Sequence, residues 1–405
     1  PPYRWLGNAY RESGDEAVVL CDRPVVPLFT PDNQPLTCST GGGRSPRISF
    51  FDPGFKLPEN LKVAMGMDRR FPWDVVATID LLYTRAVHQI YVNEANLGAP
   101  TGQASGEGGR LLYGTINTLG LATPAWRDAS FGETEVYRVS NRSGDNSLSL
   151  STQLRKRWRN AASLYASYAY SRAHDRMSLV NFPARANFSN TPVDGTLDDR
   201  RLRPSFFETP HKVAIAATLG ESHRTQLTLF YLGASQPPFT YVINGDANAD
   251  GIGGAGSLKN DIVYIPRDAN DITLVTASDS ARLDAFIEQH RCLREQRGRI
   301  MARGSCRNGW LYVLNARVTT TLAMAKGQHL EITTDVFNVP NLISPRWGRH
   351  RDVTTGPSVT LLSLAGWDST NARARYRVPL RFPARGVLDD ASSRWRVQLG
   401  ARYYL

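Results

Sequence analysis

Apolar and polar side chains alternate without a break through the last twelve residues of the chain, 394–405. Because successive side chains of a β-strand point to opposite faces, this pattern predicts a strand with one apolar face and one cationic, polar face. The apolar face carries Trp395, Val397, Leu399, Ala401, Tyr403 and Leu405. Such a face would cover the core of a soluble β-sandwich, whereas in an outer-membrane barrel it would meet lipid.

Alternating segments of similar length recur along the chain, mostly in pairs that predict hairpins. The pairs are 61–67 with 75–83, 148–154 with 164–170, 213–219 with 227–231, and 314–322 with 330–336. Further segments are a weak one before Cys21, then 359–364, 372–380 and the terminal strand. We therefore predict an all-β, antiparallel chain of about twelve strands.

The connections between these strands are of two kinds. Short turns are expected near Trp73, Arg159, Glu221 and Gly327. Long loops are expected at about 21–50, 95–145, 174–208 and 245–308. Outer-membrane barrels sort their connections in this way, with short periplasmic turns and long extracellular loops, while a soluble sandwich has little reason to. The pattern therefore favours a transmembrane β-barrel, and tyrosines at the strand ends fit its aromatic girdles.

One segment inside the longest loop has a helical period. Ser278 or Asp279 could cap a helix over 281–297. Its apolar face would carry Leu283, Phe286, Ile287 and Leu293. We expect this short helix to pack over the mouth of the barrel.

Composition excludes several classes of protein. Hydrophobic residues make up 41% of the 405 residues, and no stretch approaches the roughly 20 apolar residues that a transmembrane helix needs. The net charge is +11, but the basic residues are scattered and no nucleic-acid motif occurs, so we expect no nucleic-acid partner. The chain opens on two prolines without a targeting segment, and we expect it to be a processed or truncated product.

No pattern of catalytic residues stands out, and we do not expect an enzyme. The seven histidines are scattered, and no HExxH or nucleophile motif occurs. Asp80, Glu331 and Asp335 fall on the polar side of predicted strands, where pairing with an arginine such as Arg317 explains them better than acid catalysis does.

The four cysteines form two pairs that are local in sequence, Cys21 with Cys38 and Cys292 with Cys306. The chain has no CxxC motif, and only His290 lies at a spacing near a cysteine, so zinc is disfavoured. Two disulfides in the long loops, and hence an oxidising compartment, are the preferred interpretation. The alternative is four unpaired thiols in a cytosolic chain.

The segment GDANADG at 245–251 resembles the first half of a calcium loop. Asp246, Asn248 and Asp250 put oxygen-bearing side chains at alternate positions before a glycine. A full EF-hand would need Glu where this chain has Ser257, so Asn260 and Asp261 would have to complete the shell. The alternative is a polar surface turn, which these residue types also favour.

An ordered series of segments resembles the C-terminal barrel of TonB-dependent outer-membrane transporters of the Oar-like group. The segments are PYRWLGNAY (2–10), FDPGFKLPENLKVAMGMDRRFPW (51–73), LSTQLRKRW (150–158), LYASYAYSRAHD (164–175), GDANADG with NDIVYIPRD (245–251, 260–268), TTDVFNVPN (333–341) and SRWRVQLGARYYL (393–405). They extend over nearly the whole chain, so residues 1–405 are expected to form the C-terminal part of such a barrel.

The resemblance implies a receptor that moves a large ligand across the outer membrane with energy supplied through TonB. It implies a TonB complex reached through an N-terminal region and plug that precede this sequence, together with further strands. It also implies an assembly signal for the barrel-assembly machinery at Trp395, Val397, Leu399, Tyr403 and Leu405, although the family usually ends in Phe.

Two further expectations concern the surface of this barrel. Arginines near strand ends could bind lipopolysaccharide phosphates through paired hydrogen bonds. A different class of function also stays open, namely a structural or adhesive surface protein, or a passive pore.

Overall fold

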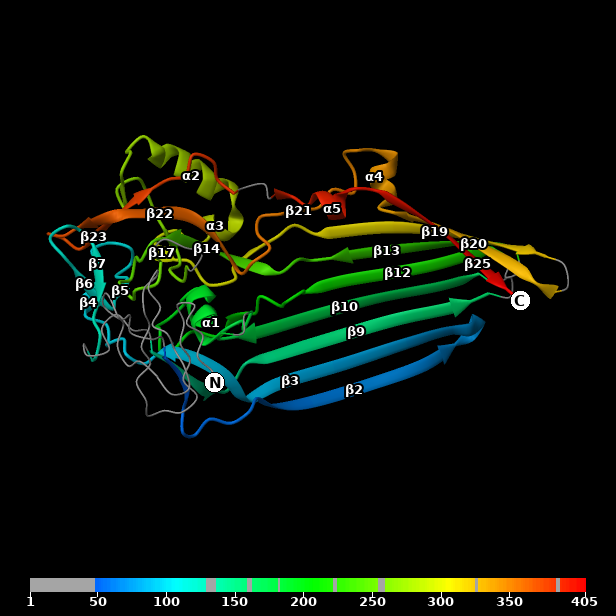
Figure 1. Cartoon of the computed structure of the whole chain (residues 1–405), viewed down its shortest axis with the longest axis horizontal. Coiled ribbons are helices and arrows are strands. Elements are labelled where there is room, and N and C mark those ends of the chain that lie inside the picture. Colours follow the sequence, from blue (N-terminus) through cyan, green and yellow to red (C-terminus); the bar gives the residue numbers. More distant parts are fainter. Residues whose placement is uncertain are drawn as a thin grey trace, which may run out of the picture.

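The computed structural model describes residues 48–128, 136–158, 162–180, 183–220, 224–253, 259–324, 327–383 and 387–405. Long strands lie side by side in one sheet, and most of the remaining chain gathers at one end of it (Figure 1). The long strands are β2 (Glu59–Phe71), β3 (Val75–Glu94), β9 (Asn146–Arg157), β10 (Ser163–Asp175), β12 (His211–Gly220), β13 (Thr225–Ala234), β19 (Leu311–Ala323), β20 (His329–Phe337) and β25 (Arg396–Tyr404). They pair antiparallel in that order. We call this sheet the wall.

Three short strands extend the wall at its loop end, namely β1 (Ile48–Phe51), β8 (Val136–Arg142) and β11 (Arg203–Pro204). The sheet then has twelve strands, the number that the sequence predicts for the whole chain, but β1, β8 and β11 correspond to no predicted strand. Its membership differs, because the segments predicted at 359–364 and 372–380 form β22 (Ser358–Asp368) and β23 (Arg373–Arg377) in a second sheet. The chain between β20 and β25 is therefore one more long connection.

The register of the wall gathers apolar side chains on one face. One continuous row of paired residues runs Ala77, Leu154, Ala166, Ile215, Tyr231 and Leu314 across six strands. Leu154 of this row is 53% exposed, since no part of the described chain covers that face there. The opposite face carries polar pairs such as Asp80 with Ser151. The predicted ion pair also lies there, with Arg317 Nη2 donating to Asp335 Oδ2 at 3.0 Å.

The wall has two free edges, formed by β2 and β25. Among the pairings of the described residues, β2 pairs only with β3, and β25 pairs only with β20. Every residue of β2 is exposed, including Leu61, Val63, Met65 and Met67 of its apolar row. The described strands therefore form an arc of a barrel whose ends are not joined to each other.

Within the described residues, the hairpin turns of the wall are short, as predicted, and lie at the end opposite the loops (Figure 1). The first is a 3-10 turn over Pro72–Asp74, in which Trp73 adopts the left-handed conformation with φ 62°. The predicted turn at Arg159 and that at Glu221 lie outside the described residues, as does the predicted loop 21–50 up to residue 47.

The loop end has a sheet and a core of its own. The second sheet contains β16 (Thr273–Leu274), β23, β22, β14 (Pro238–Asn244) and β18 (Cys306–Arg307) in that order. The described chain also forms four two-stranded sheets: β4 (Gly102–Gln103) with β5 (Leu111–Leu112), β6 (Gly114–Ile116) with β7 (Ala122–Pro124), β15 (Tyr264–Ile265) with β17 (Arg299–Ile300), and β21 (Arg351–Asp352) with β24 (Val387–Leu388). We call the described residues of the segments 104–116, 239–306 and 353–382, which pack together here, the loop domain. Its residues Ile243, Ile265, Ile287 and Leu293 are at most 1% exposed, so the main hydrophobic core lies in this domain.

The helices are short. They are α1 (Ala184–Asn190), α2 (Asp279–Gln289), α3 (Arg291–Arg294), α4 (Val339–Ile343) and α5 (Asp390–Ser393). The helix predicted over 281–297 is interrupted, because His290 is extended (φ −114°, ψ 103°) and separates α2 from α3. Its predicted apolar face is buried as expected. None of the helices in the described ranges combines the length and the apolar character needed to traverse a membrane.

Two neighbouring substitutions in β9 test the assignment of the faces. Leu150→Arg places a charge on the apolar face near the middle of the wall, where lipid contact would make it cost about 2–4 kcal/mol. Ser151→Arg places the same side chain opposite Asp80 on the polar face, and we expect little change. The free energy of unfolding of the whole protein in lipid vesicles measures both. Equal losses in the two variants would contradict the assignment.

Candidate functional site

The predicted calcium-loop residues come together inside the loop domain. The chain leaves β14 at Asn244, turns sharply, and returns so that the Ile243 N–H donates to the carbonyl of Asp261 at 2.8 Å. The turn needs left-handed backbone at Ala249 (φ 58°) and Gly251 (φ 85°), the position at which a calcium loop has glycine. We call Asp246, Asn248, Asp250, Asn260 and Asp261 the acidic cluster.

Backbone N–H groups orient the carboxylates of the acidic cluster. Asp246 accepts hydrogen bonds from the N–H of Asp250 (3.0 Å) and of Gly251 (2.9 Å). Asp250 Oδ1 accepts from the N–H of Ile252 at 2.8 Å, and Asp261 Oδ2 from that of Ala247 at 2.7 Å. The turn therefore holds its acidic side chains inward.

Side chains also join the two arms of the cluster. Asp250 Oδ2 accepts a hydrogen bond from Nδ2 of Asn260 at 2.7 Å and another from Nδ2 of Asn248 at 3.2 Å. Asp250 and Asp261 are each 2% exposed, and Asn260 is fully buried. The turn is therefore buried, not exposed as the alternative interpretation had it, and calcium binding there stays a prediction.

Burial makes these carboxylates hard to ionise. It raises the pKa of Asp246 to about 7, with the nearby Asp250 carboxylate adding to the shift. Burial likewise raises the pKa of Asp250 and that of Asp261. Their mutual repulsion in a buried site is a cost that an added positive charge would relieve.

Two buried arginines lie beside the cluster. Arg110 is 5% exposed, and its Nε donates to Glu107 at 2.8 Å while its Nη1 lies 3.9 Å from Asp261 Oδ1. The Tyr376 hydroxyl donates to the same Glu107. Arg200 is 1% exposed, and its guanidinium lies over the ring of Phe188, 4.9 Å from the ring centroid.

The cluster borders a polar cavity of about 620 Å³. Asn248, Asp261 and Arg110 contribute to one side of it, and Asp194, Arg203 and Gln296 line other parts. Arg203 Nε donates to Asp194 Oδ2 at 2.6 Å, so the lining offers both charges close together. Such a lining suits a ligand with polar groups rather than an apolar one.

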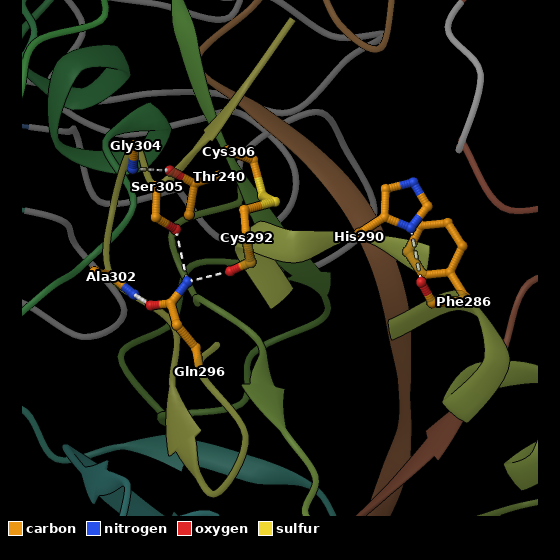
Figure 2. The surroundings of a disulfide bond; sticks show 9 residues. All are labelled: Thr240, Phe286, His290, Cys292, Gln296, Ala302, Gly304, Ser305 and Cys306. Atoms are coloured by element: carbon orange, nitrogen blue, oxygen red, sulfur yellow. Dashed lines mark hydrogen bonds between the residues drawn. A yellow bond between two sulfur atoms is a disulfide. The ribbon is translucent and has the colours of Figure 1, made fainter. Parts of the chain in front are cut away.

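The disulfide between Cys292 and Cys306 is present, as predicted, with the two Cα atoms 5.3 Å apart. Figure 2 shows Gln296 beside it, with Nε2 donating to Ser305 Oγ at 2.9 Å and Oε1 accepting from the Ala302 N–H at 2.7 Å. The bridge ties α3 to β18 at the edge of the second sheet. The predicted partners Cys21 and Cys38 lie outside the described residues.

The residues predicted as an assembly signal lie on one face of the last strand. Trp395 precedes β25, and Val397, Leu399 and Tyr403 continue its apolar row with exposures between 48% and 74%. Leu405 follows the strand and is 98% exposed. Recognition of this row by the barrel-assembly machinery stays a prediction.

Several residues of the site carried no local sequence signal. Arg110 donates a hydrogen bond to the carbonyl of Ile262, which is 152 residues away in sequence, and Tyr376 donates one to Glu107, which is 269 residues away. Only the fold brings them to the cluster. Within the described ranges, no three His, Cys, Asp or Glu side chains form a group that could hold a metal by themselves.

The comparison with known families covers more than half of the chain. A family model described as "Outer membrane beta barrel domain" matches residues 8–220. This chain belongs to that family. The outer-membrane β-barrel protein therefore has the all-β barrel fold and the outer-membrane location that its sequence predicts.

A solved structure similar to this outer-membrane β-barrel protein is that of the outer membrane transporter YddB from Escherichia coli. The two are 13% identical with a TM-score of 0.41, and the match covers 90% of this chain and 35% of that of YddB. The present chain thus spans about a third of the transporter's length. A search of curated proteins found no match.

Removal of the disulfide tests its role in the loop domain. The double variant Cys292→Ser/Cys306→Ser opens a link of sequence separation 14, which is worth about 3 kcal/mol in the entropy model. We expect faster hydrogen exchange in α2 and α3, measured in the whole protein, with β9 and β10 of the wall as internal control. Unchanged exchange in α2 would show that the core holds this region without the bridge.

Proposed function

We propose that this outer-membrane β-barrel protein is the C-terminal part of a TonB-dependent transporter of the Oar-like group. In this proposal it moves a large ligand across the outer membrane with energy supplied through TonB. The observation that carries the proposal is the unclosed wall, whose two edges, β2 and β25, do not pair with each other in the described structure.

Free edges demand partners in a membrane. Each unpaired N–H or C=O group in hydrocarbon costs several kcal/mol, and β2 and β25 would expose a row of them along the barrel. In this proposal further strands complete the cylinder, which then becomes wider than a barrel of the described strands alone. Outer-membrane transporters of about 22 strands are wide barrels whose lumen is filled by a plug, and this agrees with the resemblance of the ordered segments.

The loop domain suits the first step of such transport. It has its own core, a disulfide and a polar cavity of about 620 Å³, so it can present a preformed surface to a ligand outside the cell. The polar face of the wall would line the lumen below it. A plug in that lumen would give the TonB complex its contact, and lipid and lipopolysaccharide would surround the apolar face.

The experiment that tests the proposal is the intact mass and N-terminal sequence of the native polypeptide extracted from the outer membrane. We expect a mass well above 44.9 kDa and an N-terminal region that includes a plug. Binding of this polypeptide to the periplasmic domain of TonB should then depend on that region. A mature polypeptide that starts at Pro1 would overturn gated transport.

Conductance in planar bilayers separates the proposal from a passive pore. The native protein should conduct little, because a plug fills the lumen, whereas a pore would conduct steadily. A closed and non-conducting barrel without any plug would instead support a structural or adhesive surface protein.

A further inference from the structure

Charges in the acidic cluster and its surroundings do not balance. Four carboxylates, those of Glu107, Asp246, Asp250 and Asp261, meet two guanidinium groups, those of Arg110 and Arg200. Arg110 is held chiefly by Glu107, at 2.8 Å, and stands 3.9 Å from the nearest oxygen of Asp261. When all four carboxylates are ionised, the region carries two more negative charges than positive ones. One divalent cation would balance this excess and would favour the ionised carboxylates that burial alone disfavours.

A second observation is independent of this charge. The side chain of Asn260 is fully buried, and its Oδ1 has no hydrogen-bond partner. Its Nδ2 donates to Asp250 Oδ2 at 2.7 Å, so the unpartnered oxygen belongs to an amide group that lies directly against the central carboxylate. A buried acceptor without a partner costs about 1–3 kcal/mol, and a cation in the cluster would supply the partner.

The donor set matches calcium better than other cations. Every candidate ligand is an oxygen, from carboxylates and amides, as hard cations require. Calcium accepts six to eight oxygens in variable geometry, including main-chain carbonyls and waters, while magnesium demands a near-ideal octahedron. Each carboxylate oxygen that accepts an N–H of the turn retains a second lone pair for a cation.

We propose that the acidic cluster binds one calcium ion at the border of the loop-domain cavity. The ion reaches the cluster through the cavity, because Asn248 and Asp261 line it. By joining the turn after β14 to the returning arm at Asn260 and Asp261, it fixes one side of the cavity. The proposal does not depend on coupling to TonB, and it applies equally to a non-transporting surface protein.

A tryptophan next to the turn provides a local probe. A Cβ placed on Gly251 would lie 3.6 Å from the indole of Trp126, so this ring lies against the turn. Terbium occupies calcium sites and luminesces when a nearby indole transfers energy to it. We expect the whole protein, treated with a chelator and held in detergent, to show terbium luminescence on tryptophan excitation that calcium displaces.

Matched variants assign that signal to the cluster. Asp250→Asn should weaken calcium binding by about tenfold or more, since it removes a charge at the centre of the site. Asp268→Asn, an exposed position farther along the same loop, should bind as the unaltered protein does. Trp126→Phe should lose most of the luminescence while titration calorimetry with calcium chloride still reports the site.

Lipopolysaccharide phosphates also bind divalent cations, so all variants are compared in the same detergent preparation. If Asp250→Asn fails to fold, the unaltered protein still tests the proposal. Calcium should protect residues 245–262 from proteolysis relative to chelator, and magnesium should protect them less. A folded protein with no Trp126-dependent signal would overturn the proposal. So would equal calcium affinity in Asp250→Asn and Asp268→Asn, or protection that is the same with and without calcium.

Discussion

Hydrogen bonding between neighbouring strands is the constraint on which the rest of this structure depends. In hydrocarbon no water can satisfy a backbone N–H or C=O group, so each strand of the wall must be paired along its length. That pairing fixes the register, and the register places the row from Ala77 to Leu314 on one face and pairs such as Arg317 with Asp335 on the other. The same constraint requires hydrogen-bond partners for the backbone groups along the outer edges of β2 and β25, which have no strand partner among the described residues.

The loop domain follows a different rule, that of a globular protein in water. Its second sheet is flanked by α2, and its core holds nearly dry isoleucines and leucines, whereas large apolar side chains of the wall are exposed. The segments that build it are far apart in sequence and are held in place by the wall. A wall of paired strands with a separately packed domain at one end lets the membrane part and the loop domain change their sequences independently.

The sequence predicts the wall well and the loop domain poorly, for a physical reason. In a strand between lipid and lumen, apolar and polar side chains alternate, and this alternation is visible in each strand by itself. Hairpins such as β9 with β10 can therefore be predicted from their own two segments. The segments 359–364 and 372–380 alternate in the same way but pair with β14 and β16, since period alone does not specify the neighbour. The prediction of a helix over 281–297 is right about the buried face. It is wrong about the length of the helix, because no local sequence signal marks the extended backbone at His290.

In the candidate site, too, some features can be predicted from the local sequence and others depend on the fold. Alternating Asp246, Asn248 and Asp250 are a local signal, and the returning arm at Asn260 and Asp261 is close enough in sequence to be guessed. Their burial is not a local property, because it comes from the packing of β14, β22 and the segment around Arg110. Burial turns an ordinary polar turn into a cluster of carboxylates that repel one another. The chemistry of the site therefore depends both on a simple sequence motif and on a fold that buries it.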